Sequence, residues 1–335
     1  MTRRLLLCAA VALTALYSCK DVEHATQVSS SGKPYEIFVL ALPNVWNSSA
    51  GDTVRAIFGE YAEMLNQPEP IYDLYNANPN RAGKTILRHR NLIRMEIDSE
   101  RYPEPDMEMN YDVYANNQVQ ITITAPRADS LAQFIARNRG VLVGVFDQVE
   151  RTRMAERAVK YQNSTINKVI QDKFGIAVAI PRGYTVRNDA DNFLWISNEH
   201  PLASQGIVFY TFPCDLAAPL DENMLVVERN NAVNKIPGPL EGGYMGTETL
   251  LYPQLKHYVI NDRRWNEMRG FWKVENDFMG GPFVNYTTID TVHNRVIAID
   301  MYVYSPTAKY GKRNYVRQLE NLIVNVKIPS AAEAL

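Results

Sequence analysis

The spacing of apolar residues divides the chain into a first half that mixes strands with helices and a second half dominated by strands. In the first half, one continuous apolar run predicts a buried strand, and two stretches of strict alternation predict half-buried strands. A short stretch between the continuous apolar run and the first alternating stretch predicts a fourth strand. The predicted strands span residues 35–42, 71–75, 91–97 and 119–124.

Helical spacing of apolar residues accounts for the rest of this half. One helix is predicted from an N-terminal cap at Asp52 to Leu65, and a long helical region is predicted over 129–174, with a break near Gly140 and Gly144. The resulting order, β-α-β-β-β-α, predicts a split βαβ plan with an antiparallel sheet and helices on one face.

The second half begins at Gly175 and contains many short strand patterns separated by Gly- and Pro-rich turns. One helix is predicted behind an Asp221 cap to about residue 234, and an amphipathic helix over 314–326 closes the chain. The predicted strands span 176–180, 193–197, 206–212, 248–252, 256–260, 268–275, 283–288 and 296–304. The sequence therefore predicts an α+β protein with two halves, 34–174 and 175–329, each built on a mainly antiparallel sheet with flanking helices.

The first 19 residues have the pattern of an export signal. Arg3 and Arg4 precede an apolar stretch that is too short to cross a bilayer as a permanent helix, and the stretch ends in Leu-Tyr-Ser-Cys at Cys19. This ending resembles the lipobox of bacterial lipoproteins, which implies cleavage after residue 18 and fatty chains on the Cys19 sulfur. The polar segment 19–33 is then expected to be a flexible tether.

Lipidation would make the lipid bilayer the first partner of the chain, because two or three fatty chains bind a membrane almost irreversibly. Lys20 stands where an aspartate would signal retention at the inner membrane, which favours the outer membrane. The periplasmic face and the cell surface both remain open as locations.

Charge and cysteine content narrow the possible functions further. The 335 residues carry a net charge of −2, and loss of Arg3 and Arg4 with the signal would leave −4 (−2 − 2). A mildly acidic protein without a basic stripe is not expected to bind nucleic acid. Of the three cysteines, Cys8 lies in the signal and Cys19 is the lipid site, so Cys214 has no disulfide partner within the mature chain.

Several motifs together resemble the DUF4837 family, a family of Bacteroidetes lipoproteins without an assigned function. The motifs are Arg90-Asn91 before a strand, the loop Ile236–Met245, Arg269–Trp272, Met279–Phe283, and Tyr302–Pro306 with Lys312-Arg313 beyond it. The resemblance implies that the mature chain is a single family unit, and it carries over no catalytic residues. The second half also loosely resembles the antiparallel sheets of PsbP-like and Mog1-like folds.

Catalytic signatures are absent from the sequence. Gly83-Lys84-Thr85 lacks the first glycine of a phosphate-binding loop, no two histidines have metal-ligand spacing, and no G-x-S-x-G elbow occurs. We therefore assign no catalytic residue, metal or cofactor. An unrecognised acid pair remains an alternative, with candidates Glu267, Glu275, Asp277, Asp290 and Asp300.

Glycine- and proline-rich loops near aromatic residues are the better candidates for a site. The candidate loop residues are Tyr244, Trp272, Gly280, Gly281, Pro282 and Phe283. They predict either an aromatic-lined cleft for a glycan or peptide, or tight turns and core aromatics that close a sheet.

Three functions follow as hypotheses. The first is a noncatalytic envelope lipoprotein that binds an envelope protein or glycan partner. The alternatives are a hydrolase of envelope or other polymers, and an accessory factor in outer-membrane assembly or transport. The sequence favours no oligomeric state.

Overall fold

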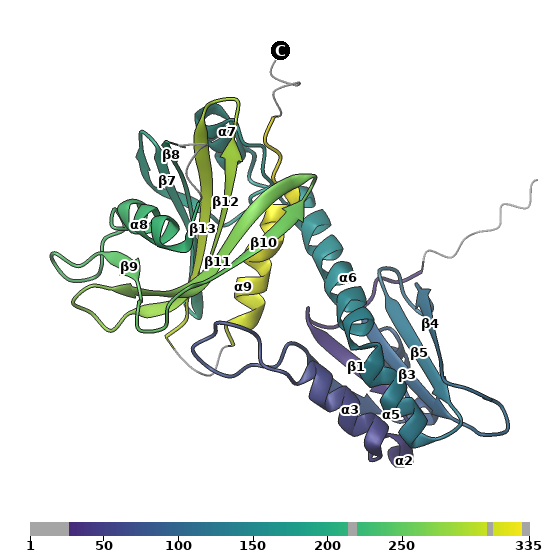
Figure 1. Cartoon of the computed structure of the whole chain (residues 1–335). Coiled ribbons are helices and arrows are strands. Elements are labelled where there is room, and N and C mark those ends of the chain that lie inside the picture. Colours follow the sequence, from purple (N-terminus) through teal and green to yellow (C-terminus); the bar gives the residue numbers. More distant parts are fainter. Residues whose placement is uncertain (1–26, 214–219, 307–310, 330–335) are drawn as a thin grey trace, which may run out of the picture.

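The computed structural model describes residues 27–213, 220–306 and 311–329, which form two sheet-and-helix halves joined by a long helix (Figure 1). Cys19, its signal segment and Cys214 lie outside these residues. The α+β class with two separate sheets is confirmed.

Five strands form the first sheet, in the order β2-β1-β3-β5-β4. Their bounds are β1 (Glu36–Leu40), β2 (Asp73–Ala77), β3 (Asn91–Ile97), β4 (Asp106–Tyr111) and β5 (Val119–Ala125). The pairs β1–β2, β1–β3 and β3–β5 are parallel, and β4–β5 is antiparallel. The predicted antiparallel arrangement is therefore wrong for this half. The connection from β1 to β2 contains helices and is long enough to return the chain to the same end of the sheet, which permits parallel pairing.

Helices cover one face of this sheet. They are α2 (Pro43–Trp46), α3 (Ser49–Phe58), α5 (Ala128–Arg137) and α6 (Arg139–Lys160), while the short η2 (Pro79–Arg81) and α4 (Lys84–Leu87) lie between β2 and β3. Alternate strand residues such as Ile37, Ile93 and Ile121 form a core with this layer. The α3 cap is Ser48 rather than Asp52, which lies in the first turn. The helical region breaks after Arg137 and after Lys160, so Gly140 and Gly144 lie inside α6.

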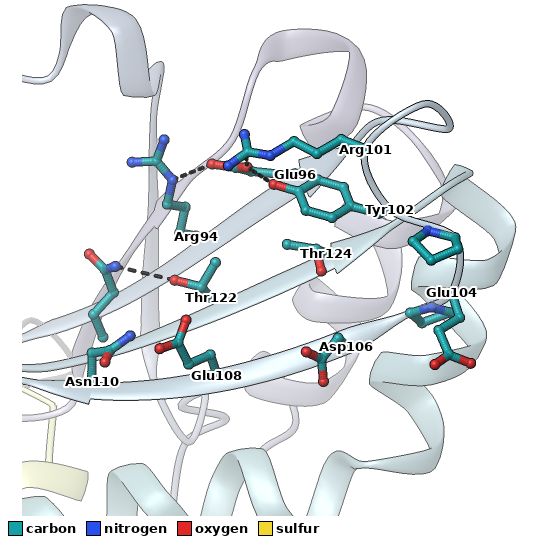
Figure 2. Close-up of a pocket in the computed structure, with 13 residues that line it drawn as sticks. Arg94, Glu96, Arg101, Tyr102, Glu104, Asp106, Glu108, Asn110, Thr122 and Thr124 are labelled. Carbon is teal, nitrogen blue, oxygen red and sulfur yellow. Dashed lines mark hydrogen bonds and ion pairs between the residues drawn. The ribbon is translucent and has the colours of Figure 1, made fainter.

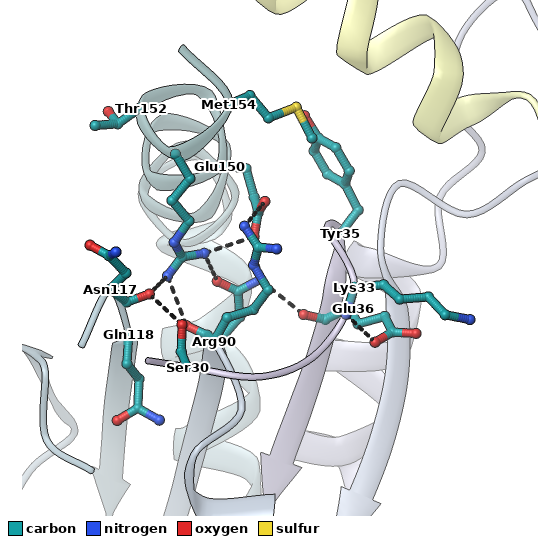
Figure 3. A network of polar contacts seen from close by, with 12 residues as sticks. Ser30, Lys33, Tyr35, Glu36, Arg90, Asn117, Gln118, Glu150, Thr152 and Met154 are labelled. Atoms are coloured by element: carbon teal, nitrogen blue, oxygen red, sulfur yellow. Dashed lines mark hydrogen bonds and ion pairs between the residues drawn. The ribbon is translucent and has the colours of Figure 1, made fainter. Parts of the chain in front are cut away.

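A short N-terminal segment is bonded to the first half. The Ser30 N–H donates to the Asn116 carbonyl and the Ser31 N–H donates to the Arg88 carbonyl, both at 2.9 Å. Behind them, Figure 3 shows the buried Glu150 carboxylate of α6 next to the Arg90 guanidinium at 2.9 Å. The bonds of Ser30 and Ser31 hold this N-terminal segment against the first half, whereas we expected residues 19–33 to form a flexible tether.

Eight strands form the second sheet, and all of its pairs are antiparallel, as expected. The order is β10-β11-β12-β13-β8-β7-β6, with β9 beside β11. The bounds are β6 (Thr185–Ala190), β7 (Phe193–His200), β8 (Ala203–Pro213), β9 (Met245–Thr247), β10 (Gln254–Ile260), β11 (Arg263–Val274), β12 (Gly280–Asp290) and β13 (Arg295–Tyr304). The stretches 176–180 and 248–252 form no strand, contrary to expectation, and β4 and β6 were not predicted.

Both faces of the second sheet are covered, so this half has two cores. One core lies under α8 (Glu222–Val233), which begins at the predicted Asp221 cap. The other packs against α7 (Ser164–Phe174), α9 (Arg313–Glu320) and η3 (Asn321–Asn325). The apolar side of α7 belongs to this second core, although α7 lies within the range 34–174 that was predicted as the first half.

The halves meet along α9 and η3. The Glu69 carboxylate of the first half accepts from the backbone N–H groups of Lys312 and Arg313, at 2.6 and 3.0 Å, and so caps α9. Arg313 also pairs with Asp73 at 2.8 Å, and Arg317 contacts Asp147 at 3.3 Å. These polar contacts tie the first sheet and α6 to the second half.

Candidate functional site

The face of β3, β5 and β4 that carries no helices is polar and concave, and we call it the polar face (Figure 2). It encloses a pocket of about 700 Å³. The lining is Arg94, Glu96, Arg101, Tyr102, Pro103, Glu104, Pro105, Asp106, Glu108, Asn110, Gln120, Thr122 and Thr124. A sheet face with this composition has little apolar area to bury against the rest of the protein.

Strand register arranges these side chains in rows. Because alternate residues point to the same face, residues opposite each other on the three strands form lines across the sheet. The rows are Leu92–Gln120–Asn110, Arg94–Thr122–Glu108 and Glu96–Thr124–Asp106. Neighbouring strands lie about 4.8 Å apart, so each row places three side chains within about 10 Å.

Glu96 organises one end of the polar face. Its carboxylate accepts a hydrogen bond from Arg94 Nε at 2.5 Å and a short one from the Tyr102 hydroxyl, and Arg101 lies 3.7 Å away. Burial alone would raise the pKa of Glu96, but the hydrogen bonds from Tyr102 and Arg94 outweigh it and lower the pKa. The hydrogen bond to Glu96, with burial second, raises the pKa of Tyr102. The cluster is therefore a carboxylate held by two cations and a phenol.

The remaining acids of the polar face have no cationic partner among the described residues. Glu104 and Glu108 take part in no hydrogen bond or ion pair with the described residues, and Asp106 accepts only the neighbouring Met107 N–H, at 2.8 Å. In addition, Gln120 is 6% exposed and its Oε1 atom has no donor. A buried acceptor without a donor costs free energy. The polar face thus has hydrogen-bonding and charge capacity that the described protein does not use.

The Glu96 cluster predicts a pH-dependent contribution to stability. Glu96→Gln is expected to reduce the free energy of unfolding by about 1 kcal/mol at pH 7, because hydrogen bonds to a charged group are lost. The folded state lowers the pKa below its ordinary 4.5, so this contribution exists above that pH and is lost as the pH falls through the folded value. Urea unfolding from pH 7 to pH 3 should show the difference between wild type and variant shrinking; a constant difference would contradict the assignment.

The loop residues predicted from sequence are mostly core residues. Trp272 and Phe283 are 2% exposed, and Pro282 is buried as well. A Cβ on Gly281 would lie 2.2 Å from the Val303 carbonyl oxygen and 3.0 Å from the Trp272 ring nitrogen, so this glycine makes room for the neighbouring backbone and for the indole. The second of the two predicted alternatives, turns and core aromatics that close a sheet, therefore describes these residues.

A smaller pocket does lie next to these loops. It has a volume of about 450 Å³ and includes Trp272, Gly280 and Gly281 in its lining. Its other apolar lining residues are the exposed Phe278, Leu65 from the first half, Leu251, Phe271 and Met279. Tyr244, 44% exposed, is not in the lining, so the structure brings together only some of the predicted site residues.

The five candidate acids of the second half are separated. Glu267 accepts from Arg269 and Tyr286, both at 2.6 Å, on one face of the sheet. Asp300 is fully buried on the other face, paired with Arg229 at 2.7 Å. The other three are engaged locally: Asp290 by Arg295, Glu275 by Lys273, and Asp277 by the Met279 N–H. This arrangement gives no support to a shared catalytic acid pair.

No group of three or more His, Cys, Asp or Glu side chains within residues 27–213, 220–306 and 311–329 is placed to hold a metal ion. Across the same ranges, no helix is both long and apolar enough to traverse a bilayer.

The polar face was missed at the level of sequence because β4 was not predicted. The sequence Asp-Met-Glu-Met-Asn-Tyr of β4 does alternate polar and apolar residues, which is the strand signal. It lacks the β-branched residues that usually strengthen that signal. Recognising β4 would have placed Asp106 and Glu108 on one face.

The fold and the site define an α+β protein of two sheet-and-helix halves with an open, acceptor-rich polar face on the first. Residues 163–325 match the model of the family described as "Domain of unknown function (DUF4837)". This match confirms the expected resemblance to the DUF4837 family for the second half of the chain. Residues 30–159 match a different model, "Domain of unknown function (DUF8532)", so the resemblance is shorter than the whole mature chain that we expected.

Comparisons with individual proteins add little. No curated protein matches this chain. Among solved structures, Saccharomyces cerevisiae Ran-binding protein Mog1p is 12% identical, with a TM-score of 0.31, over 48% of this chain and 94% of that one. A point mutant of protein Mog1 is 12% identical, with a TM-score of 0.30, over 47% of this chain and 92% of that one. Human StAR-related lipid transfer protein 5 is 8% identical, with a TM-score of 0.23, over 53% of this chain and 95% of that one. Similarity at this level carries no functional argument.

Proposed function

We propose that the chain is a noncatalytic lipoprotein of the cell envelope that binds a ligand or partner on the polar face. One observation carries the proposal: the buried Gln120 Oε1 has no donor among the described residues, and beside it on β4 Glu108 has no hydrogen-bond partner and Asp106 accepts only the adjacent Met107 N–H. A ligand that donates hydrogen bonds to them would recover the free energy of the buried, unpaired acceptor. A role as an accessory factor in outer-membrane assembly or transport would be one form of this binding function.

The membrane part of the proposal rests on the residues around Cys19. Their resemblance to a lipobox supports lipidation, and the absence of an aspartate after Cys19 supports the outer membrane, at its periplasmic face or at the cell surface. The chain from Cys19 to Gln27 can span at most about 30 Å. Gln27 donates to the Asp112 carbonyl at 2.9 Å, so the turn between β4 and β5 would stay within that distance of the lipid.

Site-specific crosslinking in intact cells tests the binding function. A photoreactive side chain placed at Thr122, in the middle row of the polar face, is expected to crosslink the bound molecule, whether protein or glycan. The matched control carries the same side chain at Glu156, which is exposed on α6. If Thr122 gives no product beyond that of Glu156, the polar face is not a binding surface and the proposal fails.

A further inference from the structure

The strand β4 forms an open edge of the first sheet. It is the last strand in the order β2-β1-β3-β5-β4, and it lies at the outer side of the first half in Figure 1. The Asp112 N–H donates to the Gln118 carbonyl at 3.0 Å. Because bonded pairs alternate along an antiparallel ladder, the backbone groups of Met109 and Tyr111 then point away from β5. Such outward groups are a template for another strand.

The two sides of this edge differ in chemistry. On the polar face, β4 presents Asp106 and Glu108, both exposed and without cationic partners among the described residues. On the opposite side, Met109 is 43% exposed and Tyr111 is 61% exposed. A charged edge by itself discourages pairing between copies of one protein. An acidic edge with exposed apolar residues behind it instead fits a strand of opposite charge.

The chemistry of the lining narrows the ligand class. The two arginines of the polar face are both directed to Glu96, so the free charged groups are carboxylates, and the buried Gln120 Oε1 is a free acceptor beside them. Those acceptors need cationic or other donor groups. Tyr102 is the single aromatic residue of the lining, and the Arg101 guanidinium lies over its ring with its carbon 5.2 Å from the ring centre, which leaves little stacking surface for a sugar ring. A basic side chain meets these requirements better than a neutral glycan does.

We propose that the polar face takes an extended peptide segment with alternating basic and apolar residues, belonging to a partner protein, which adds as a strand to the edge of β4. This inference rests on the proposed binding function and names its ligand class. An added strand would lie about 4.8 Å from β4. Its basic residues would then stand beside Asp106 and Glu108, where opposite charges on neighbouring strands stabilise pairing. Its apolar residues would cover Met109 and Tyr111, as in other cases of strand addition.

Peptide binding to the full-length protein in detergent tests the inference. The probe is a capped peptide of alternating Lys and Val that matches the six residues of β4. We expect saturable binding by isothermal titration calorimetry that weakens as salt rises. A peptide with Glu in place of Lys, and one with the same composition in two blocks, should bind at least tenfold more weakly. Equal binding of either control peptide, of spermine or of Mg²⁺ would overturn the proposed strand addition.

Variants of β4 separate charge from backbone pairing. Glu108→Lys should weaken binding at least tenfold, while Glu156→Lys on α6 should leave it unchanged. Met109→Pro removes an outward N–H without breaking the ladder to β5, so it should abolish binding, whereas Met109→Ala should reduce it only modestly. Unchanged thermal unfolding of each variant shows that the sheet is intact, and Glu108→Gln provides a milder charge change if Glu108→Lys unfolds.

The outcomes also separate this inference from the proposed function. If crosslinking at Thr122 succeeds but the Lys–Val peptide does not bind, the binding function stands and the basic strand is wrong. If neither experiment gives a signal, both are wrong.

Discussion

Replacing Asp300 by alanine is expected to lower the free energy of unfolding of the second half by about 3–5 kcal/mol. Asp300 and Arg229 are both fully buried, with Arg229 Nε 2.7 Å and Nη2 3.2 Å from the two carboxylate oxygens. Asn285 donates to the same carboxylate at 3.0 Å. The variant would leave a guanidinium in the core without its counter-charge, which costs far more than the lost hydrogen bonds.

The surroundings of Arg229 explain why water cannot replace the carboxylate. The guanidinium carbon lies 3.6 Å from the centre of the Phe283 ring, and Nη1 donates to the Thr247 hydroxyl at 2.7 Å. These contacts hold the cation beneath α8, away from solvent. Urea unfolding followed by tryptophan fluorescence measures the loss, because Trp265 and Trp272 are both buried in this half.

Two comparisons make the test specific. Glu275→Ala breaks a surface pair with Lys273 at 3.2 Å and should cost less than about 1 kcal/mol. The double replacement Arg229→Met with Asp300→Leu removes both charges and should recover most of the stability lost in Asp300→Ala. A loss below about 1 kcal/mol for Asp300→Ala would show that Arg229 is not buried as the structure places it.

Local patterns in the sequence predicted the strands and caps that depend on near neighbours. Alternation located β3 and β5, and Asp221 caps α8 through its bond to the Met224 N–H at 2.8 Å. Strand direction was not predictable in the same way, because alternation is identical in parallel and antiparallel strands. The strands of the first sheet were therefore predicted to be antiparallel, whereas three of its four strand pairs are parallel.

The candidate site depends on contacts between distant residues. The row Arg94–Thr122–Glu108 joins three strands, and its register follows from pairing that no local pattern contains. The Arg229–Asp300 pair spans 71 residues for the same reason. By contrast, Trp272 and Phe283 were noticed because aromatic residues near glycines stand out in a sequence. Their burial shows that such a pattern also arises wherever a glycine makes room for a ring.

The second large effect concerns the membrane. Cys19→Ala is expected to move the protein from the membrane fraction to the soluble fraction, because the proposed lipid is the only anchor that the sequence predicts. Loss of two or three fatty chains removes an association that is otherwise almost irreversible. Sedimentation of lysed cells at high speed, followed by immunoblotting, measures the distribution.

Cys8→Ala is the matched control for this experiment, since Cys8 lies inside the apolar stretch of the signal and is expected to be removed with it. That variant should remain with the membranes, and mass spectrometry of its mature N-terminus should find a modified Cys19. Retention of Cys19→Ala at the membrane would have a different meaning: the body of the protein would then bind the envelope by itself. In that case Glu108→Lys, combined with Cys19→Ala, would show whether the polar face is responsible, because loss of the remaining membrane association would assign it to β4.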